Sequence, residues 1–466
     1  MYQERAFELH THLYGCLRED ELRWLASRKK PRWHIFSNTF EKTYGKPPDL
    51  ENIFSPSRKE DLRKYSVYES VGNFPQFQCC FDFVISVAHA DEQEVYDVAR
   101  RLSKRQTEPY AEYRMLFGPQ LEMEDYRRRI VSLCEGFHSA QNDSYLVMSL
   151  WRGGDLAAKQ YETLLQLMDD YPVVRQRLVG VDFCAQEEGY PPEDKADLFQ
   201  SILSNNREYP DKALSILYHV GESFQDKSVE SAVRWIYESA RLGAHRLGHC
   251  IALGQDPQEF LGTVRKESLS ERIHQLEFEL AHGLAVSHPN EDEIRNELEE
   301  LRQSSLDWQA RASASTAGAE QSGEVSSSEE KNAVGPAGNE GNSAFADDLI
   351  YGTEPQIAVH YTPDHVDRLK SFQDRLMEKL KEMQVVIEVC PTSNQRIGAV
   401  TRHPVHRFLE NDLSIVVGAD DPGIFDTDLE TEFQILSNDG IKQQKLEEMV
   451  ERSRISHSAA LSGRKG

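Results

Sequence analysis

The chain has 466 residues and a formal net charge of -25, from 53 Lys and Arg against 78 Asp and Glu. This length fits one large α/β barrel with insertions, and the negative charge argues against nucleic acid as a partner, because phosphate binding needs a basic surface. An acidic chain suits small or cationic ligands, and no uncharged apolar run reaches the length of a membrane span.

The cysteines and the first residues indicate a cytoplasmic setting. The seven cysteines are an odd number without a CxxC pair, which predicts reduced thiols. Charged residues begin at Glu4 and no apolar signal-peptide core follows, so we expect no secretory leader.

The stretch from Phe7 to Gly15 reads FELHTHLYG, with apolar residues alternating with histidines. That alternation is typical of a strand, and it places His10 and His12 on one face. Two imidazoles side by side on a strand make half of a metal site. The alternative is two ordinary polar histidines near a strand end.

Beyond a helical region from Glu19 to Arg105, short apolar runs alternate with longer amphipathic stretches, the pattern of βαβ units. Together with the first strand the sequence contains eight such runs: Phe7–Leu13, Tyr110–Leu116, Ser144–Trp151, Arg177–Cys184, Leu214–Glu222, Arg246–Ile251, Val385–Thr392 and Ser414–Asp420. Eight parallel strands with helices predict a closed (β/α)8 barrel spanning residues 1–466 as one domain, with its chemistry at the C-terminal ends of the strands.

The sixth and seventh runs are too far apart for a simple crossover, so we expect an insertion over about 258–384. Its first part is helical and charged, and Asn290 is the predicted N-cap of a Glu-rich first turn. Residues 311–342 are rich in Ser, Ala, Gly and Glu, a composition that predicts disorder. Thr362 and Pro363 then predict the start of a helix that runs to about Met383.

Polar residues follow several of these strands. The fifth run ends at His219 and, after the flexible Gly221, Glu222; a glutamate in a closed apolar site can have its pKa raised and donate a proton. The alternative is a glutamate that starts a helix. His249 ends the sixth run as a candidate base or orienter of water, or as a structural histidine.

The eighth run ends in two acids, Asp420 and Asp421, which are costly to place at a barrel mouth without a cation or hydrogen-bond donors. The alternative is a solvated turn before Pro422. Three histidines (His10, His12 and His219) and Asp420 at strand ends predict an N/O site with room for water. That set matches catalytic zinc, with iron or manganese as the alternative.

In this order the motifs resemble the adenosine deaminase family, which includes adenine deaminases, within the amidohydrolase superfamily. The matching motifs are His10-Thr-His12-Leu-Tyr-Gly15, Val179-Gly-Val-Asp182, His219-Val-Gly-Glu222, Arg246-Leu-Gly-His249, Cys390-Pro-Thr-Ser-Asn394 and Asp420-Asp421-Pro422. The resemblance covers nearly the whole chain except the insertion. It implies a (β/α)8 barrel, one zinc per chain and hydrolytic deamination of a 6-aminopurine with release of ammonia.

The resemblance also implies roles for individual residues. His10, His12, His219 and Asp420 would hold zinc, and His12 and Gly221 would also line the substrate site. Glu222 would donate a proton to purine N1, while His249 would orient the attacking hydroxide and stabilise charge at C6. Asp421 would accept a hydrogen bond at N7.

Two residues and the insertion depart from the family pattern. Tyr14 stands where nucleoside enzymes usually carry a short acid or amide near the sugar, so we expect weak dependence on the 5′-hydroxyl. Ala185, or its neighbour Gln186, falls near the usual glycine whose backbone approaches the purine. The alternative substrates are therefore adenine, a modified adenosine or a nucleotide. The alternative to an enzyme is a non-catalytic relative that binds purines.

Overall fold

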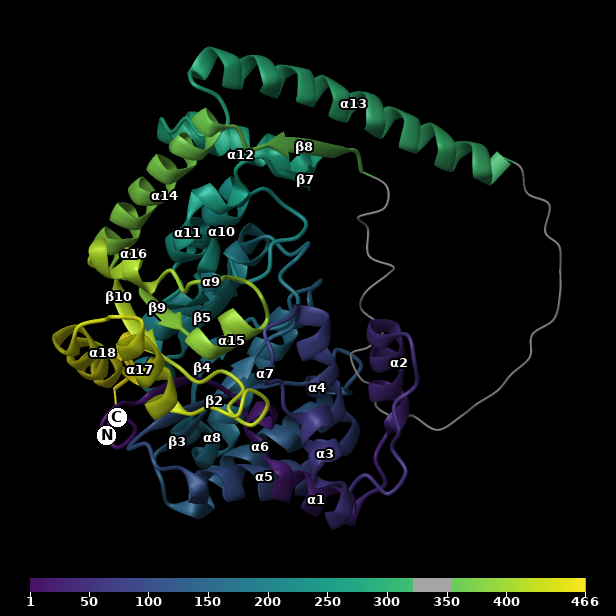
Figure 1. The fold of residues 1–466 in the computed structure, drawn as a ribbon, viewed down its shortest axis with the longest axis vertical. Coiled ribbons are helices and arrows are strands. Elements are labelled where there is room, and N and C mark those ends of the chain that lie inside the picture. Colours follow the sequence, from purple (N-terminus) through teal and green to yellow (C-terminus); the bar gives the residue numbers. More distant parts are fainter. Residues whose placement is uncertain (322–353, 466) are drawn as a thin grey trace.

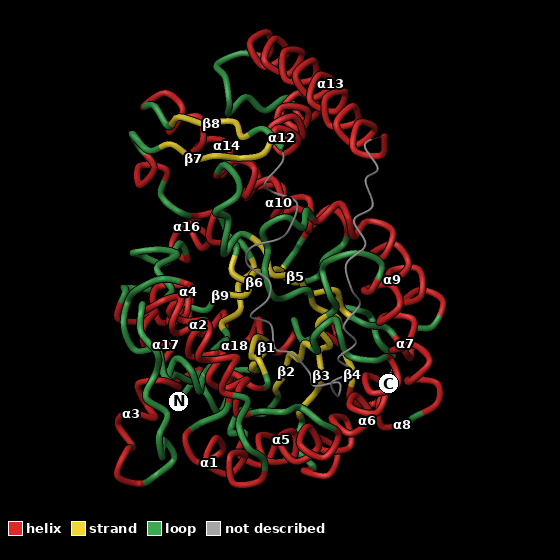
Figure 2. The backbone as a smooth tube through the Cα atoms, turned by 90° about the vertical axis from the view of Figure 1, so that its right-hand side faces the viewer, coloured by secondary structure: helices red, strands yellow, loops and turns green. Residues whose placement is uncertain are grey.

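The chain folds around an eight-stranded parallel sheet that curls into a barrel, seen end-on in Figure 2. The computed structural model describes residues 1–321 and 354–465. In sheet order the strands are β1 (Glu8–His12), β2 (Ala111–Leu116), β3 (Ser144–Ser149), β4 (Leu178–Asp182), β5 (Ser215–Val220), β6 (Arg246–His249), β9 (Val386–Val389) and β10 (Ser414–Val417). Each lies within one of the eight predicted runs, so the predicted barrel is confirmed.

The barrel closes where its first and last strands meet. Thr11 pairs with Asp420 in an isolated parallel bridge. The backbone N–H of His12 donates to Asp420 O, and that of Asp420 donates to His10 O, each at 2.8 Å. Closure leaves no open sheet edge between the first and last strands. It also brings the predicted site residues His10, His12 and Asp420 together at this seam.

Helices surround the strands, as expected for a parallel sheet whose apolar strands must be covered, and Figure 1 shows them along the chain. Those before and within the first six units are α1 (Glu19–Arg28), α2 (Trp33–Tyr44), α3 (Lys59–Ser66), α4 (Phe74–Val87), α5 (Glu92–Arg105), α6 (Met123–Ala140), α7 (Leu156–Asp170), α8 (Pro172–Arg177), α9 (Ala196–Glu208), α10 (Val229–Leu242) and α11 (Ile251–Gly254). Those after β9 are α15 (Pro391–Arg396), α16 (Val405–Glu410), α17 (Leu429–Asn438), α18 (Gln443–Ile455) and α19 (Ser458–Leu461).

The predicted insertion lies between β6 and β9, the sixth and seventh barrel strands, and extends from the barrel in Figures 1 and 2. It contains the antiparallel pair β7 (Val264–Ser268) and β8 (Gln356–His360) and the helices α12 (Leu269–His282), α13 (Glu291–Gln321) and α14 (Pro363–Met383). The β7–β8 pair was not predicted.

Local signals in the insertion placed two helix starts correctly. The Asn290 side chain accepts from the backbone N–H of Glu293 at 3.0 Å, and that of Thr362 accepts from His365 at 3.3 Å. Helix α13 ends at Gln321, inside the segment 311–342 for which the sequence predicts disorder. The rest of that segment lies outside the described residues.

Charged side chains are buried among the barrel strands. Glu112 and Arg114 on β2, Arg246 on β6 and Glu388 on β9 are at most 1% exposed. Arg246 donates to Glu388 Oε1 at 2.6 Å and to Glu112, while Arg114 donates to Glu388 Oε2. Because each buried charge has an opposite partner, the barrel interior is a hydrogen-bonded ionic network.

In the described part of the chain, none of the helices combines the length and the apolar composition needed to span a bilayer.

Candidate metal and catalytic site

Three predicted metal ligands converge at the seam of the barrel. His10 Nε2 lies 3.7 Å and His12 Nε2 lies 3.3 Å from Asp420 Oδ1. Two ligands held at zinc distances in a tetrahedral site stand about 3.4 Å apart, so these spacings suit one ion. Potential ligand atoms of His10, His12 and Asp420 all lie within 4.8 Å of one another.

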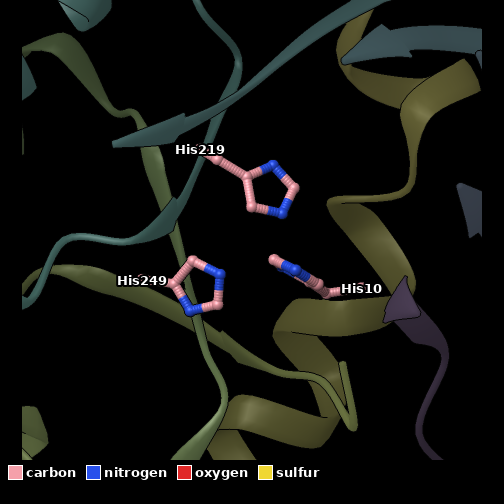
Figure 3. Close-up of side chains that lie close together, drawn as sticks. All are labelled: His10, His219 and His249. Atoms are coloured by element: carbon pink, nitrogen blue, oxygen red, sulfur yellow. The ribbon is translucent and has the colours of Figure 1, made fainter. Parts of the chain in front are cut away.

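The fourth predicted ligand, His219, joins this group through His10. Ligand nitrogens of His10, His219 and His249 also lie within 4.8 Å of one another, and Figure 3 shows the three rings turned toward a common space. The structure therefore brings together all four predicted ligands and the predicted orienter, His249.

Carboxylates behind two of these histidines fix which ring nitrogen carries the proton. His10 Nδ1 lies 2.8 Å from Glu388 Oε2, and His219 Nδ1 lies 3.0 Å from Asp182 Oδ1. Each Nδ1–H can donate to its carboxylate, which leaves Nε2 with a lone pair, the form that a metal requires.

Arg114 gives independent support for that assignment. Its Nη1 lies 3.2 Å from His10 Nε2 and 3.3 Å from His219 Nε2. A guanidinium can only donate hydrogen bonds, so His10 Nε2 acts as an acceptor here. At His219 the same Nη1 also lies 3.4 Å from Nδ1, so for that ring the assignment rests on the Asp182 contact. Burial also lowers the pKa of His10 well below its ordinary value, which keeps its ring neutral. The donor set thus fits a divalent ion with nitrogen and oxygen ligands.

Three site residues at or shortly beyond the ends of their strands adopt left-handed backbone conformations. The φ angle is 67° at His249, 60° at Asp420 and 69° at Ala185. Such conformations cost of order 1–3 kcal/mol for residues with a Cβ and are often found at functional sites. Gly15 serves the same region by its lack of a side chain, since a Cβ there would stand 1.7 Å from Asp421 Oδ1.

Glu222 and His249 form a second group beside the ligands. Glu222 Oε2 lies 3.4 Å from His249 Nε2, and Asn394 Nδ2 donates to Glu222 Oε1 at 3.2 Å. Burial, followed by the charge of Asp420, raises the pKa of Glu222 well above its ordinary value. Burial lowers the pKa of His249 to about 3. The pair can therefore present a protonated carboxyl beside a neutral imidazole.

Glu187 anchors the loop that carries Glu222. Its Oε1 accepts from the backbone N–H of Gly221 at 2.8 Å and its Oε2 from that of Glu222 at 3.3 Å. The N–H of Gly221, a predicted substrate contact, is therefore already bonded within the protein. This anchoring fixes the position of the glutamate backbone relative to β5.

The other predicted substrate contacts differ in their surroundings. Asp421 is 4% exposed, and its Oδ1 is buried without a partner among the described residues; burial and Asp420 raise its pKa to about 8. Ala185 is exposed. Tyr14 is 4% exposed, and its hydroxyl donates to Glu94 Oε1 on α5 at 3.0 Å.

Five polar residues of this region received no role from the sequence: Arg114, Asp182, Glu187, Glu388 and Asn394. A usable signal existed for two of them, because Arg114 and Glu388 are charges within runs predicted to be barrel strands, where a buried charge must have a partner. Asp182 and Asn394 stood in quoted motifs, but their contacts depend on residues far away in the sequence.

The chain is similar to known proteins in sequence and in structure. Residues 360–462 match the family described as adenosine deaminase. An aminodeoxyfutalosine deaminase from Acidothermus cellulolyticus is 40% identical over 74 residues, 15% of this chain and 21% of that protein. An adenosine deaminase from Streptococcus agalactiae is 25% identical over 253 residues, 53% of this chain and 63% of that protein. The chain thus spans less than two thirds of these relatives.

Two solved structures share the fold. An adenine deaminase from Arthrobacter aurescens has a TM-score of 0.50 at 16% identity, covering 97% of this chain and 93% of its own. An amidohydrolase with bound Zn from Burkhoderia ambifaria has a TM-score of 0.51 at 12% identity, covering 98% and 86%. Together the comparisons confirm the resemblance that the motifs predicted.

Proposed function

We propose, from the premise that this chain resembles the adenosine deaminase family, that it hydrolyses a C–N bond in a 6-aminopurine. The specific reaction is zinc-dependent deamination of adenosine or a close nucleoside to the 6-oxo product with release of ammonia. The family match in residues 360–462 and the deaminases among its relatives support the reaction class.

One observation carries this proposal: a metal-ligand group and an acid–imidazole pair meet at the same strand ends. His10, His12 and Asp420 supply the ligand atoms, and Glu222 lies 3.4 Å from His249 beside them. A hydrolase for an amidine needs an activated water and a proton donor within reach of one substrate atom. The ligand group and the acid–imidazole pair, held by side chains on a barrel, support the proposal on both counts.

In this proposal Glu222 donates a proton to purine N1, which makes C6 electrophilic. Its raised pKa suits that role, because a carboxyl must keep its proton near neutral pH to act as a general acid. The oxygen of water adds to C6, the C6–N bond breaks, and C6 becomes a carbonyl. Of the two water protons, one goes to the departing amino group, which leaves as ammonia, and the other restores the proton that Glu222 gave to N1. His249 orients the incoming oxygen. Purine N7 carries no proton and can only accept, so Asp421, whose pKa is raised to about 8 by burial and Asp420 and whose Oδ1 has no partner among the described residues, donates the hydrogen bond to N7, the reverse of the direction that the resemblance implied.

His10, His12, His219 and Asp420 would hold one metal ion per chain, and zinc is the ion that we propose. When bound, zinc supplies a Lewis acid that makes water a nucleophile at neutral pH. The nitrogen and oxygen donors support this choice, as does the zinc in the structurally similar amidohydrolase. Iron or manganese is the alternative for the same ligands.

A second candidate substrate is an adenosine modified at its 5′ position. The observation that favours it is Tyr14, which replaces the short polar residue expected next to the sugar and whose hydroxyl is bonded to Glu94. The phenol of Tyr14 is neutral and uses its O–H in the bond to Glu94, so it does not offer a ribose hydroxyl the ionised acceptor that a short acid would. Adenine, named for the structurally similar Arthrobacter protein, is a further candidate for the same chemistry.

Release of ammonia by the metal-loaded protein tests the proposal. The substrates are adenosine, deoxyadenosine, 5′-methylthioadenosine, AMP and adenine, compared by kcat/KM. A preference for 5′-methylthioadenosine would identify a modified nucleoside as the substrate, while a hundredfold preference for adenosine over 5′-methylthioadenosine would show that the 5′-hydroxyl is recognised. No ammonia from any of the five would refute the proposed function.

We also propose a single domain and a cytoplasmic setting. Tyr361 of the insertion donates to Glu230 Oε2 on barrel helix α10 at 2.9 Å, so the insertion is bonded to the barrel, which supports one domain.

The cysteines support the cytoplasmic setting. All seven are buried and free, as expected for a reducing compartment.

A further inference from the structure

A series of hydrogen bonds leads from the backbone of α16 to the imidazole of His249. It begins at Val405, whose backbone N–H donates to His403 Nδ1 at 3.2 Å. A ring nitrogen that accepts a hydrogen bond carries no proton, so the proton of this imidazole is on Nε2. His403 is 2% exposed, and it lies outside the motifs on which the family resemblance depends.

The next member is Asn394, which has no solvent exposure. His403 Nε2 lies 3.3 Å from Asn394 Oδ1, so the histidine N–H has an acceptor. On the other side, Asn394 Nδ2 lies 3.0 Å from His249 Nδ1 and 3.2 Å from Glu222 Oε1. The two N–H groups of one amide can serve both acceptors.

The orientation of the Asn394 amide is determined at both ends. A flipped amide would direct its NH2 group at the N–H of His403, donor against donor. It would also direct its oxygen at Glu222 Oε1, an oxygen that here accepts. The flip would therefore lose the bonds on both sides, and buried polar groups without partners are costly.

This orientation decides which nitrogen of His249 is protonated. The amide NH2 can only donate, so Nδ1 of His249 accepts and its ring proton is on Nε2. Nε2 is the nitrogen that lies 3.4 Å from Glu222 Oε2, on the reacting side. His249 therefore offers an N–H, and not a lone pair, to whatever oxygen is bound there.

We propose that His403 is a positioning residue that fixes the Nε2–H tautomer of His249 through Asn394. The consequence for turnover rests on the proposed deamination: His249 then acts as a hydrogen-bond donor to the oxygen that adds at C6. Among the described residues the hydrogen bonds of His403 run to Val405 and Asn394, so its effect on His249 is transmitted by the Asn394 amide.

A matched pair of substitutions isolates the Nε2 donor of His403. Glutamine places an amide N–H close to the position of that nitrogen, while leucine fills similar space without a donor. The tautomer of His249 is read by 15N NMR of ring-labelled histidine, with its signal among the sixteen histidines assigned by loss in His249→Gln. Metal content is measured in every variant.

We expect the Nε2–H tautomer in the wild type and in His403→Gln, and a mixture of tautomers in His403→Leu. In the deamination assay, His403→Leu should lower kcat by about 10- to 100-fold, the range for removing an outer-shell partner. Its KM and metal content should stay within about twofold of the wild type, and His403→Gln should recover most of the loss, by the same outer-shell reasoning. A general packing defect would not be rescued by glutamine alone.

A second variant keeps the test decisive if His403→Leu does not fold. In Asn394→Asp an acceptor replaces the donor at nearly constant shape, so His249 should become protonated at Nδ1. An unchanged tautomer in both variants, or glutamine performing no better than leucine, would overturn the proposal. If the wild type deaminates no purine, the proposed function fails, while the tautomer comparison still decides the role of His403.

Discussion

Replacing Glu388 by Gln should destabilise the barrel strongly, because this carboxylate is the common acceptor of its ionic interior. Glu388 is fully buried and accepts from His10 Nδ1 at 2.8 Å, from Arg246 Nε at 2.6 Å and from Arg114. Glutamine keeps one acceptor oxygen but directs an NH2 group at a donor. Two buried guanidinium groups would also lose their shared counter-charge.

The magnitude follows from those contacts. A hydrogen bond to a charged group contributes about 1.5–3 kcal/mol, and removing one partner of a buried ion pair costs about 3–5 kcal/mol. We therefore expect the free energy of unfolding to fall by about 3–5 kcal/mol. Metal affinity should fall by about 10- to 100-fold, since Glu388 orients a predicted ligand, His10.

Urea unfolding of the metal-free protein measures the first effect, and competition with a chelator measures the second. The control is Glu447→Gln, the same substitution in an exposed ion pair with Arg5 whose side chains are 36% and 44% exposed; it should change neither quantity. A loss below about 1 kcal/mol for Glu388→Gln, or equal losses in both variants, would refute the reasoning that the interior depends on this carboxylate.

Three further predictions concern single side chains. Glu222→Gln should keep the metal and lower kcat by ~10²–10⁴, the usual range for losing a general acid; near-normal kcat would remove Glu222 from the mechanism. His219→Ala should lose both metal and turnover, and full zinc occupancy by elemental analysis would exclude it as a ligand. In α13, burial alone would raise the pKa of Glu297, but hydrogen bonds from His288 and Arg272 lower it to about 2. A carboxyl with a depressed folded-state pKa stabilises the protein above its ordinary pKa of about 4.5 and loses that effect as pH falls toward 2. The unfolding free-energy difference between wild type and Glu297→Gln should therefore shrink over that range in urea titrations, and a constant difference would contradict the linkage.

The sequence predicted the barrel because each strand carries its own local signal. Buried parallel strands read as short apolar runs, and all eight runs contain a strand. The caps at Asn290 and Thr362 were equally local, because each accepts from a residue three positions later. The β7–β8 pair had no such signal: both strands are largely exposed, and their partners lie some 90 residues apart.

The candidate site was predictable in part for the same reason. The four histidines at 10, 12, 219 and 249 lie in the C-terminal parts of strands, and the acids at 420 and 421 follow one. The C-terminal ends of parallel barrel strands meet at one face. The sequence could not predict the roles of residues that act through partners brought close only by the fold. Asn394 lies 145 positions from His249. His403 is nine positions from Asn394, but that spacing matches no motif or periodicity that would indicate a contact.

The closure of the barrel by Thr11 and Asp420 has a consequence for biogenesis. His10 and His12 come from the first strand, while Asp420 follows the last one, so a ribosome must synthesise at least 420 residues before the ligand set exists. We therefore expect the proposed metal to be bound tightly only by a chain whose barrel is complete, so that metal occupancy would report on successful assembly. Fragments that end before β10 would contain several of the same histidines and yet bind the ion weakly, which limits sequestration of metal by incomplete translation products.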